Sequence, residues 1–324
     1  MASLPGLLKF TPRLRTVRWG GNRLAFFKNE KPTTDKVGES WEISALPGML
    51  TEISEGPMQG MTLPGLLDEY GEELMGERLY QRYGTEFPLL IKFIDAEDDL
   101  SIQVHPDDIL MHGRGKTELW YIIDSAPGSV IYSGLNRTLT PSALRRHIED
   151  HTLTDVLACH HPMGGDVFYL PAGRVHSIGA GNLVLEVQQS SDITYRLWDY
   201  ERRDENGNLR ELHVEKAMRA IDFNQTDYGL ARPQILRGIE TLVKQTPFFS
   251  VTAVLVDDTL DIQVGDMDSF RILVAVDGNG SITANDGSSM TIKCGETVFV
   301  PAVTESVRIK SGNRPLKLIT VYIA

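Results

Sequence analysis

Cysteine is scarce in this sequence. Cys159 and Cys294 are the only two among 324 residues, and they lie far apart along the chain. A small secreted scaffold held together by disulfides needs more cysteines at closer spacing, so that class of protein is excluded. We expect instead a chain that works in a reducing compartment, the cytoplasm.

Long apolar runs are also missing. A membrane-spanning helix needs roughly 20 consecutive apolar residues, and no stretch of the sequence approaches that length. The first residues, MASLPGLLKFTPRLR, place a short apolar patch ahead of the basic residues, the reverse of the order in a secretory signal peptide. We therefore expect neither a membrane span nor a signal for export.

Basic residues are outnumbered by acidic ones. The chain has 32 lysines and arginines against 44 aspartates and glutamates, which gives a formal net charge of −12. Nucleic acids and anionic membranes bind to basic surfaces, so neither is expected as a partner. An anionic small molecule would need a local cluster of lysine and arginine within this acidic surface. The sequence gives no indication of the oligomeric state.

The pattern of apolar residues is mainly that of β-strands. Helical periodicity interrupts it at about 63–83 and 141–159, and Trp19-Gly20-Gly21 is typical of a turn between two short strands. From residue 248 onward, short strand patterns alternate with turn residues. We expect a catalytic, metal-binding domain over 1–221, a linker over 222–247 and a C-terminal domain over 248–324.

One segment of the sequence occurs twice. GDVFYLPAGRVHSI at Gly165 and GETVFVPAVTESVRI at Gly295 align without a gap, and both contain an acidic residue, an apolar run and Pro-Ala. Ser306 stands at the position equivalent to His176. This repeat predicts two related β-barrels, of which only the first keeps metal-binding side chains.

Four side chains in the first half of the chain have the chemistry of metal ligands. Gln103 and His105 are two residues apart in an alternating segment, so a β-strand would place both on one face. Glu118 opens the strand pattern ELWYIID, and His176 follows the strand pattern VFYL and a Pro-Ala-Gly turn. Imidazole, carboxylate and amide oxygen together suit one divalent ion such as zinc, with a position left open for water or substrate.

The order of these motifs resembles a known family. The segment from Gly165 to His176 resembles the second cupin motif, and two such units form a bicupin jelly roll. The first cupin motif normally has His-x-His followed closely by Glu, whereas here Gln103 replaces the first histidine and Glu118 lies further away. Both departures are typical of type I mannose-6-phosphate isomerases, which the chain resembles over nearly its whole length, and most closely their short bacterial branch. The matching segments are WGG at Trp19, GESWEIS at Gly38, FPLLIKFIDAEDDLSIQVHPDD at Phe87, GKTELWY at Gly115, PAGRVHSIGAG at Pro171 and QQSSDITYRLWDY at Gln188.

The resemblance implies an enzyme that interconverts mannose 6-phosphate and fructose 6-phosphate with bound zinc. The metal ligands that the resemblance implies are the same four residues that the strand patterns proposed. The implied zinc ligands are Gln103, His105, Glu118 and His176, the catalytic residues are Arg196 and Lys116, and the substrate-binding residues are Lys92, Ser101, Glu186 and Asp192.

The chemistry of an aldose–ketose isomerase explains these residue types. A proton leaves the carbon beside a carbonyl and returns to the neighbouring carbon, and the enediol between the two states places negative charge on oxygen. A metal ion and a permanently charged arginine both stabilise that oxygen, which is the role expected of Arg196. Lys116, Asp192 and Glu186 are all candidates to carry the proton, and the sequence does not rank them. The side chains expected to attract the phosphate are Lys92, Lys116, Arg196 and Arg202.

Two other functions stay open. A cupin could keep the metal and lose the reaction, and would then bind sugars or sugar phosphates without turnover. A cupin oxygenase that uses iron is a third candidate. The amide of Gln103 is a weak donor for redox iron, which speaks against the oxygenase. The presence of both Arg196 and Lys116 speaks against a module that only binds.

Overall fold

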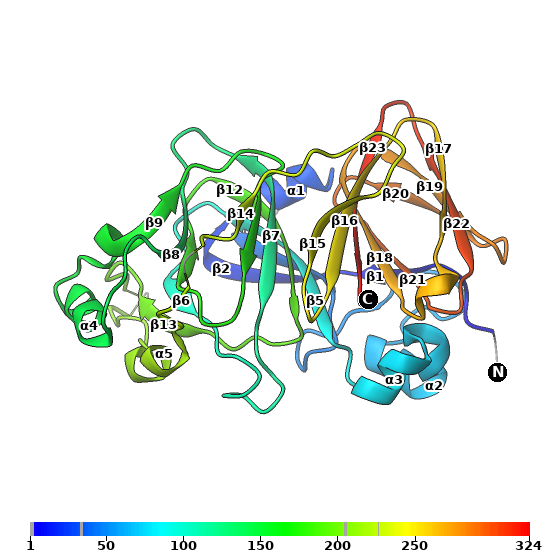
Figure 1. Ribbon diagram of the computed structural model, residues 1–324. Coiled ribbons are helices and arrows are strands. Elements are labelled where there is room, and N and C mark those ends of the chain that lie inside the picture. The colour runs from blue at the N-terminus through cyan, green and yellow to red at the C-terminus, as the bar shows by residue number, and fades with distance from the viewer. Residues whose placement is uncertain (1–2, 33–34, 204–205, 226) are drawn as a thin grey trace.

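A computed structural model describes residues 3–32, 35–203, 206–225 and 227–324. As predicted, the protein is mainly β, with few helices, and two barrel-like halves lie side by side (Figure 1). No helix in these ranges is long and apolar enough to cross a membrane.

Two antiparallel sheets form the first half. The seven-stranded sheet has the order β14-β10-β7-β12-β5-β3-β2, and the five-stranded sheet has the order β13-β6-β11-β8-β9. The bounds of these strands are β2 Arg13–Gly21, β3 Val37–Ile43, β5 Leu89–Ala96, β6 Ile102–Val104, β7 Glu118–Ser125, β8 Ile131–Leu135, β9 Leu157–His160, β10 Val167–Leu170, β11 His176–Ile178, β12 Asn182–Gln189, β13 Tyr195–Trp198 and β14 Leu230–Ala231.

The second half repeats this plan. Its seven-stranded sheet has the order β15-β16-β23-β18-β21-β1-β4, and its four-stranded sheet has the order β17-β22-β19-β20. The bounds of these strands are β1 Leu8–Thr11, β4 Glu52–Ile53, β15 Thr241–Gln245, β16 Ser250–Val256, β17 Thr259–Gln263, β18 Arg271–Asp277, β19 Asn279–Ala284, β20 Ser289–Lys293, β21 Thr297–Val300, β22 Ser306–Ser311 and β23 Leu316–Tyr322.

The sequence repeat corresponds to equivalent strands. β10 and β21 occupy the same place in the two copies of the repeat. β10 pairs with β7, and β21 pairs with β18, the corresponding strand of the second half. β11 begins at His176 and β22 begins at Ser306, the two residues that the alignment matched. The prediction of two related barrels is therefore confirmed in the order of the strands.

Neither barrel is built from one continuous piece of chain. β1, at the start of the chain, pairs with β21 of the second half. Within 222–247, β14 pairs with β10 of the first half and β15 with β16 of the second; residue 226 lies outside the described residues. The division at 222–247 stays a prediction, and this segment contributes an edge strand to each half.

The predicted turn at Trp19-Gly20-Gly21 is wrong, because β2 continues through these three residues. A Cβ atom on Gly20 would lie 2.4 Å from the backbone nitrogen of Gly38. The glycines therefore allow β2 and β3 to approach each other closely, and the chain turns only afterwards, at the short helix α1 (Arg23–Phe27).

The remaining helices lie at the two ends of the molecule. Thr62 and Thr140 cap α2 and α4 by accepting hydrogen bonds from the backbone nitrogens of Gly65 and Ala143. α2 and α3 pack below the second half, whereas α4 and α5 lie at the far end of the first (Figure 1). Their bounds are α2 Leu63–Met75, α3 Glu77–Tyr83, α4 Pro141–Glu149, α5 Val214–Ala220, and the 3₁₀ helices η1 Leu153–Val156 and η2 Gly265–Met267.

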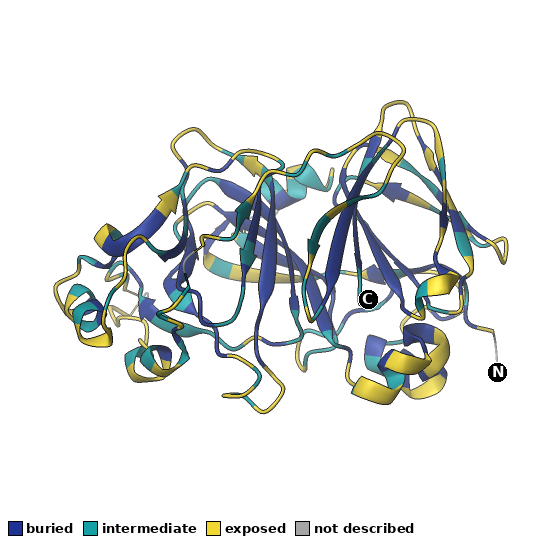
Figure 2. Cartoon of the chain, viewed as in Figure 1, coloured by how far each residue is buried: buried dark blue, intermediate teal, exposed yellow. Residues whose placement is uncertain are grey.

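One apolar core joins the two halves. A single cluster of buried side chains contains residues of both seven-stranded sheets, and the central strands are buried along much of their length (Figure 2). Phe87, before β5, packs against Phe270 at a ring distance of 4.9 Å, and Phe270 stacks on Phe299 of β21 at 5.3 Å. The second barrel therefore supports the sheet that carries the candidate site.

Candidate active site

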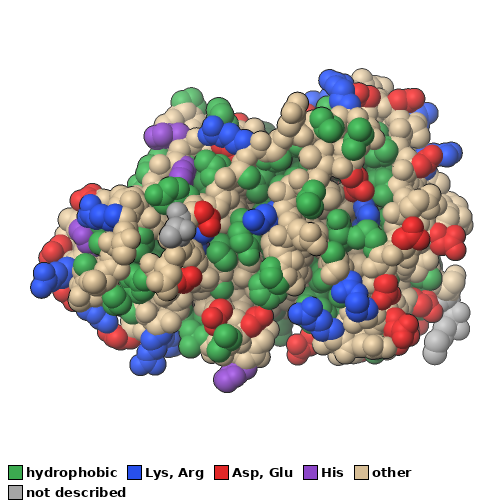
Figure 3. Space-filling model, in the orientation of Figure 1, with side chains coloured by type: hydrophobic (Ala, Val, Ile, Leu, Met, Phe, Trp, Pro, Cys, Tyr) green, Lys and Arg blue, Asp and Glu red, His purple; other side chains and the backbone are tan. Residues whose placement is uncertain are grey.

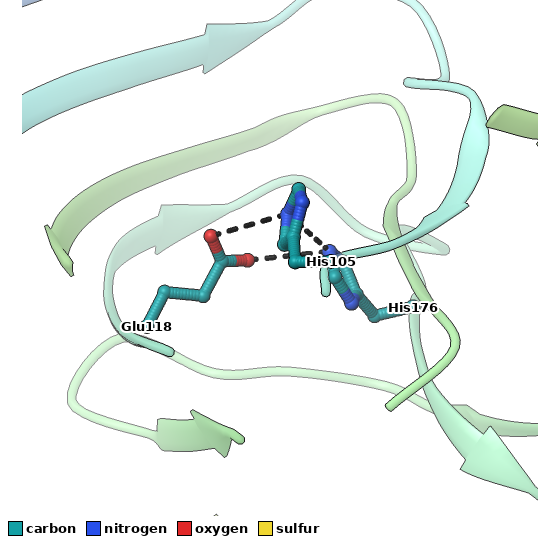
Figure 4. Close-up of side chains that lie close together, drawn as sticks. All are labelled: His105, Glu118 and His176. Atoms are coloured by element: carbon teal, nitrogen blue, oxygen red, sulfur yellow. Dashed lines mark hydrogen bonds and ion pairs between the residues drawn. The ribbon is translucent and has the colours of Figure 1, made fainter. Parts of the chain in front are cut away.

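Three of the proposed metal ligands converge in the first barrel (Figure 4). His105 follows β6, Glu118 begins β7 and His176 begins β11. The Nε2 atoms of the two histidines lie 3.2 Å apart, and they lie 3.4 and 3.2 Å from the two carboxylate oxygens of Glu118. All three side chains are buried. The strands thus hold three donor groups around one point.

Hydrogen bonds fix the orientation of both imidazole rings. Nδ1 of His105 lies 2.8 Å from the carbonyl of Ile193, and Nδ1 of His176 lies 2.8 Å from the carbonyl of Arg174. Because a carbonyl only accepts, each Nδ1 carries the proton and each Nε2 presents a lone pair. Outer hydrogen bonds of this kind are typical of histidines that bind a metal.

Lone pairs that face one another need a cation between them. Both oxygens of Glu118 are buried without a hydrogen-bond partner among the described residues. Burial alone would raise the pKa of Glu118, but Lys116 and the two imidazoles outweigh it and hold this pKa well below its usual range. Burial and the charge of Lys116 lower the pKa of His105 to about 4. The cluster is therefore a neutral imidazole pair with an ionised carboxylate, a donor set that fits a divalent ion.

Gln103 lies at the edge of this cluster. It stands opposite His176 in the pairing of β6 with β11, and its amide nitrogen lies 3.4 Å from Nε2 of His176. Its Oε1 accepts a hydrogen bond of 3.4 Å from the hydroxyl of Ser101. Rotation of the amide by half a turn would direct its oxygen toward the cluster, as a fourth ligand requires.

A cavity of about 220 Å³ opens beside these donors. Its lining includes Gln103 and Ser101, together with Trp19, Trp120 and other apolar side chains. Charged side chains of both signs line it, with basic residues in the majority: Arg15, Glu39, Lys92, Lys116, Glu186, Asp192, Arg196 and Arg210.

Lys92 is held inside the sheet. Its ammonium lies 2.8 Å from Oε1 of Glu186, 3.9 Å from Oε2 of Glu39 and over the ring of Trp41. Burial would lower the pKa of Lys92, but the two carboxylates outweigh burial and raise this pKa above its ordinary value. The charge of Lys92 is therefore already balanced by protein side chains.

Lys116 connects the metal cluster to Glu186. Its ammonium is buried, 3.3 Å from Oε2 of Glu118 and 4.0 Å from Oε1 of Glu186. Oε2 of Glu186 accepts a hydrogen bond of 2.7 Å from the indole of Trp120. Positive and negative side chains therefore alternate across the sheet, in the order Glu118, Lys116, Glu186 and Lys92.

Arg196 enters the cavity from β13. Its Nε donates to the hydroxyl of Ser101 at 3.3 Å, and its Nη1 donates to the carbonyl of Glu211 at 2.9 Å. Asp192 lies at an exposed edge, where its carboxylate is 3.4 Å from Nη1 of Arg15. All of the proposed substrate-binding and catalytic residues therefore line one cavity.

Arg202, expected to help attract the phosphate, lies elsewhere. Its guanidinium pairs with Asp199 at 2.5 Å and donates to the carbonyl of Asp99, and Arg202 does not line the cavity. Arg210 lines the cavity in its place, although no sequence motif marks it. Arg15 and Glu39 also line the cavity, although the sequence motifs did not propose them as site residues. Glu39 lies within GESWEIS, one of the segments that resemble the family.

Known protein families match both halves of the chain. Residues 7–121 match the phosphomannose isomerase type I catalytic domain, and residues 238–323 match the mannose-6-phosphate isomerase cupin domain.

Individual relatives extend these matches over most of the chain. Mannose-6-phosphate isomerase ManA from Bacillus subtilis is 39% identical over 251 residues, which cover 75% of this chain and 78% of the relative. Mannose-6-phosphate isomerase from Streptococcus mutans is 34% identical over 297 residues, which cover 89% of this chain and 90% of the relative. The crystal structure of mannose 6-phosphate isomerase from B. subtilis superimposes with a TM-score of 0.84 at 31% identity, covering 98% of this chain and 99% of that one. This chain belongs to the type I phosphomannose isomerase family.

Proposed function

We propose that the protein is a metal-dependent aldose–ketose isomerase that interconverts mannose 6-phosphate and fructose 6-phosphate through an enediol. Membership of the family and the names of its relatives support this activity. The observation that carries it in this chain is one cavity lined by Lys116 and Arg196 directly beside the buried donors His105, Glu118 and His176.

The metal in this proposal is zinc, held by Gln103, His105, Glu118 and His176. Two imidazoles, a carboxylate and an amide oxygen are the nitrogen and oxygen ligands that zinc accepts, and open catalytic sites bind it this way. When bound, the ion supplies Lewis acidity toward the oxygens on C1 and C2 of the open-chain sugar.

The protein side chains divide the remaining tasks. A basic group takes the proton from C2 of the aldose and returns it to C1. A second proton passes from the oxygen on C2 to the oxygen on C1, which gives the ketose. Lys116 and Glu186 are buried beside the donors, whereas Asp192 is exposed at the edge, so the buried pair is better placed to move this proton. Arg196 holds a permanent charge toward the developing negative oxygen.

The proposed partner is a small sugar phosphate in the cytoplasm. Neither nucleic acid nor a membrane surface is part of the proposal, because the formal net charge is −12. On the face shown in Figure 3, acidic and basic side chains are interspersed over the surface. Surfaces that bind nucleic acid instead concentrate basic side chains in one patch.

A direct test separates turnover from binding alone. Purified protein loaded with zinc is incubated with mannose 6-phosphate, and the carbon NMR signals are followed over time. We expect fructose 6-phosphate signals to grow until both sugars are at equilibrium. A cupin that only binds would broaden or shift the mannose 6-phosphate signals and form no product, which would contradict the proposal.

A further inference from the structure

We propose that Arg210 binds the phosphate group of the substrate at the open end of the cavity. This inference rests on the proposed function, since it assigns a role within the same site. Arg210 lines the cavity, and its side chain is 38% exposed, in contrast to the buried Lys116 at the metal end.

The two lysines that line the cavity lie against buried carboxylates. Lys92 contacts Glu186 and Glu39, and Lys116 lies 3.3 Å from Glu118. All of these side chains are buried. A phosphate dianion placed there would lose most of its hydration and approach carboxylates as closely as ammonium groups, so binding in this region is unfavourable.

Arg15 is balanced in the same way. Its guanidinium lies 3.4 Å from the carboxylate of Asp192 and 3.7 Å from that of Glu39. The wall formed by β2, β3, β5, β12 and the segment after β12 thus carries Arg15 and Lys92 against Glu39, Glu186 and Asp192. This wall has no excess of positive charge to offer a phosphate.

The opposite wall has such an excess. The carbonyl of Glu211 accepts a hydrogen bond from Nη1 of Arg196 at 2.9 Å, which ties the residue after Arg210 to β13. Burial, and after it the nearby charge of Arg210, lowers the pKa of Arg196 below its ordinary value. Two guanidinium groups are thus held close enough to repel each other, an arrangement that a bound dianion would relieve.

Asp199 keeps Arg210 in place without neutralising it fully. Its Oδ1 accepts from Arg202 at 2.5 Å and from Arg210 at the longer distance of 3.3 Å. Asp199 is buried, so its position is fixed by the barrel. One carboxylate is shared by two arginines, and Arg210 retains donors for a ligand.

These positions orient the substrate. The metal donors lie at the buried end of the cavity, and Arg210 lies where the cavity meets solvent. A sugar phosphate whose C1 and C2 lie beside the donors and Arg196 would direct C6 and its phosphate toward Arg210. A phosphate at the exposed end also keeps part of its hydration, which reduces the desolvation penalty of binding a dianion.

The test compares a phosphorylated and a free sugar. Zinc-loaded wild type, Arg210→Gln and Arg237→Gln are assayed with mannose 6-phosphate and with mannose, and inorganic phosphate is tested as a competitive inhibitor. Arg237 is the matched control, because it is an exposed arginine paired with Asp257 outside the cavity. Its replacement removes the same charge.

We expect Arg210→Gln to lower kcat/KM for mannose 6-phosphate by about 10- to 100-fold, the effect of losing a charged hydrogen bond. The inhibition constant of inorganic phosphate should rise by a similar factor. Any rate of Arg210→Gln with mannose, and every rate of Arg237→Gln, should stay as in wild type.

Two results would overturn the inference. Equal losses with mannose and mannose 6-phosphate would show that Arg210 only supports the shape of the cavity. Unchanged kinetics with both sugars would place the phosphate elsewhere. Should wild type convert neither sugar, the proposed function would fail, and phosphate binding would be read from thermal unfolding instead. Inorganic phosphate that raises the Tm of wild type but not of Arg210→Gln would still support the assignment, and equal rises would contradict it.

Discussion

His105 and His176 direct their Nε2 atoms at each other across 3.2 Å, and a backbone carbonyl accepts a hydrogen bond from Nδ1 of each ring. Neither ring can turn away from the other without breaking that hydrogen bond. Glu118 lies beside both rings, and neither of its carboxylate oxygens accepts a hydrogen bond from a described residue. The barrel therefore holds its donors in place for a metal ion, so little reorganisation is needed on binding.

Replacement of a proposed ligand should remove both metal and activity. His105→Ala leaves Glu118 and His176 with one imidazole fewer, and we expect the purified protein to contain little zinc and to convert no mannose 6-phosphate. Elemental composition and a coupled assay measure the two effects. Ser306→Ala is the matched control, because Ser306 occupies the position of His176 in the second barrel. Full activity of His105→Ala would show that this ligand assignment is wrong.

Loss of the arginine should separate chemistry from metal binding. Arg196→Ala removes a fixed positive charge whose hydrogen bonds go to Ser101 and to the carbonyl of Glu211, while His105, Glu118 and His176 keep their places. We expect normal zinc content and a fall in kcat of about 10²- to 10⁴-fold, the range for losing one electrostatic stabiliser. Steady-state kinetics on protein of known metal content measure this. An unchanged kcat would remove Arg196 from the proposed mechanism.

Removal of the buried lysine should destabilise the fold. Lys92→Met leaves Glu186 and Glu39 buried without their shared counter-ion. We expect the free energy of unfolding to fall by about 3–5 kcal/mol, the usual effect of breaking a buried ion pair from one side. Denaturant unfolding of zinc-loaded protein provides the measurement.

An exposed ion pair serves as the comparison for Lys92. Arg308 pairs with Asp261 at 2.7 Å, and both side chains are more than half exposed. Arg308→Gln should change the free energy of unfolding by no more than about 0.5 kcal/mol. Equal effects of the two substitutions would mean that Lys92 acts as an ordinary surface charge.

Local patterns predicted the barrels and proposed the four metal donors, whereas the other site residues were implied by the family resemblance. The repeat at Gly165 and Gly295 required two similar units, and the structure places equivalent strands there. The alternation around Gln103 and His105 put both side chains on one face, because that face follows from strand geometry alone. His176 begins β11, which pairs with β6, and Glu118 begins β7 in the other sheet of the barrel.

Long-range partners could not be predicted in the same way. The pairing of β1 with β21 joins the two ends of the chain, and nothing in Leu8–Thr11 specifies it. The pattern FPLLIKFID left open whether Lys92 reaches solvent or a pocket, because its carboxylates come from β3 and β12. Arg210 lies in irregular chain, where no periodicity shows which way a side chain points.

The dependence of turnover on the bound metal can be measured in a single experiment. The rate of fructose 6-phosphate formation from mannose 6-phosphate is measured before treatment with a chelator, after it and after zinc is restored, with elemental composition taken at each stage. We expect close to one zinc per chain before treatment, loss of turnover when the zinc is removed, and recovery of turnover when it is restored. Full turnover by metal-free protein would contradict the proposed metal dependence.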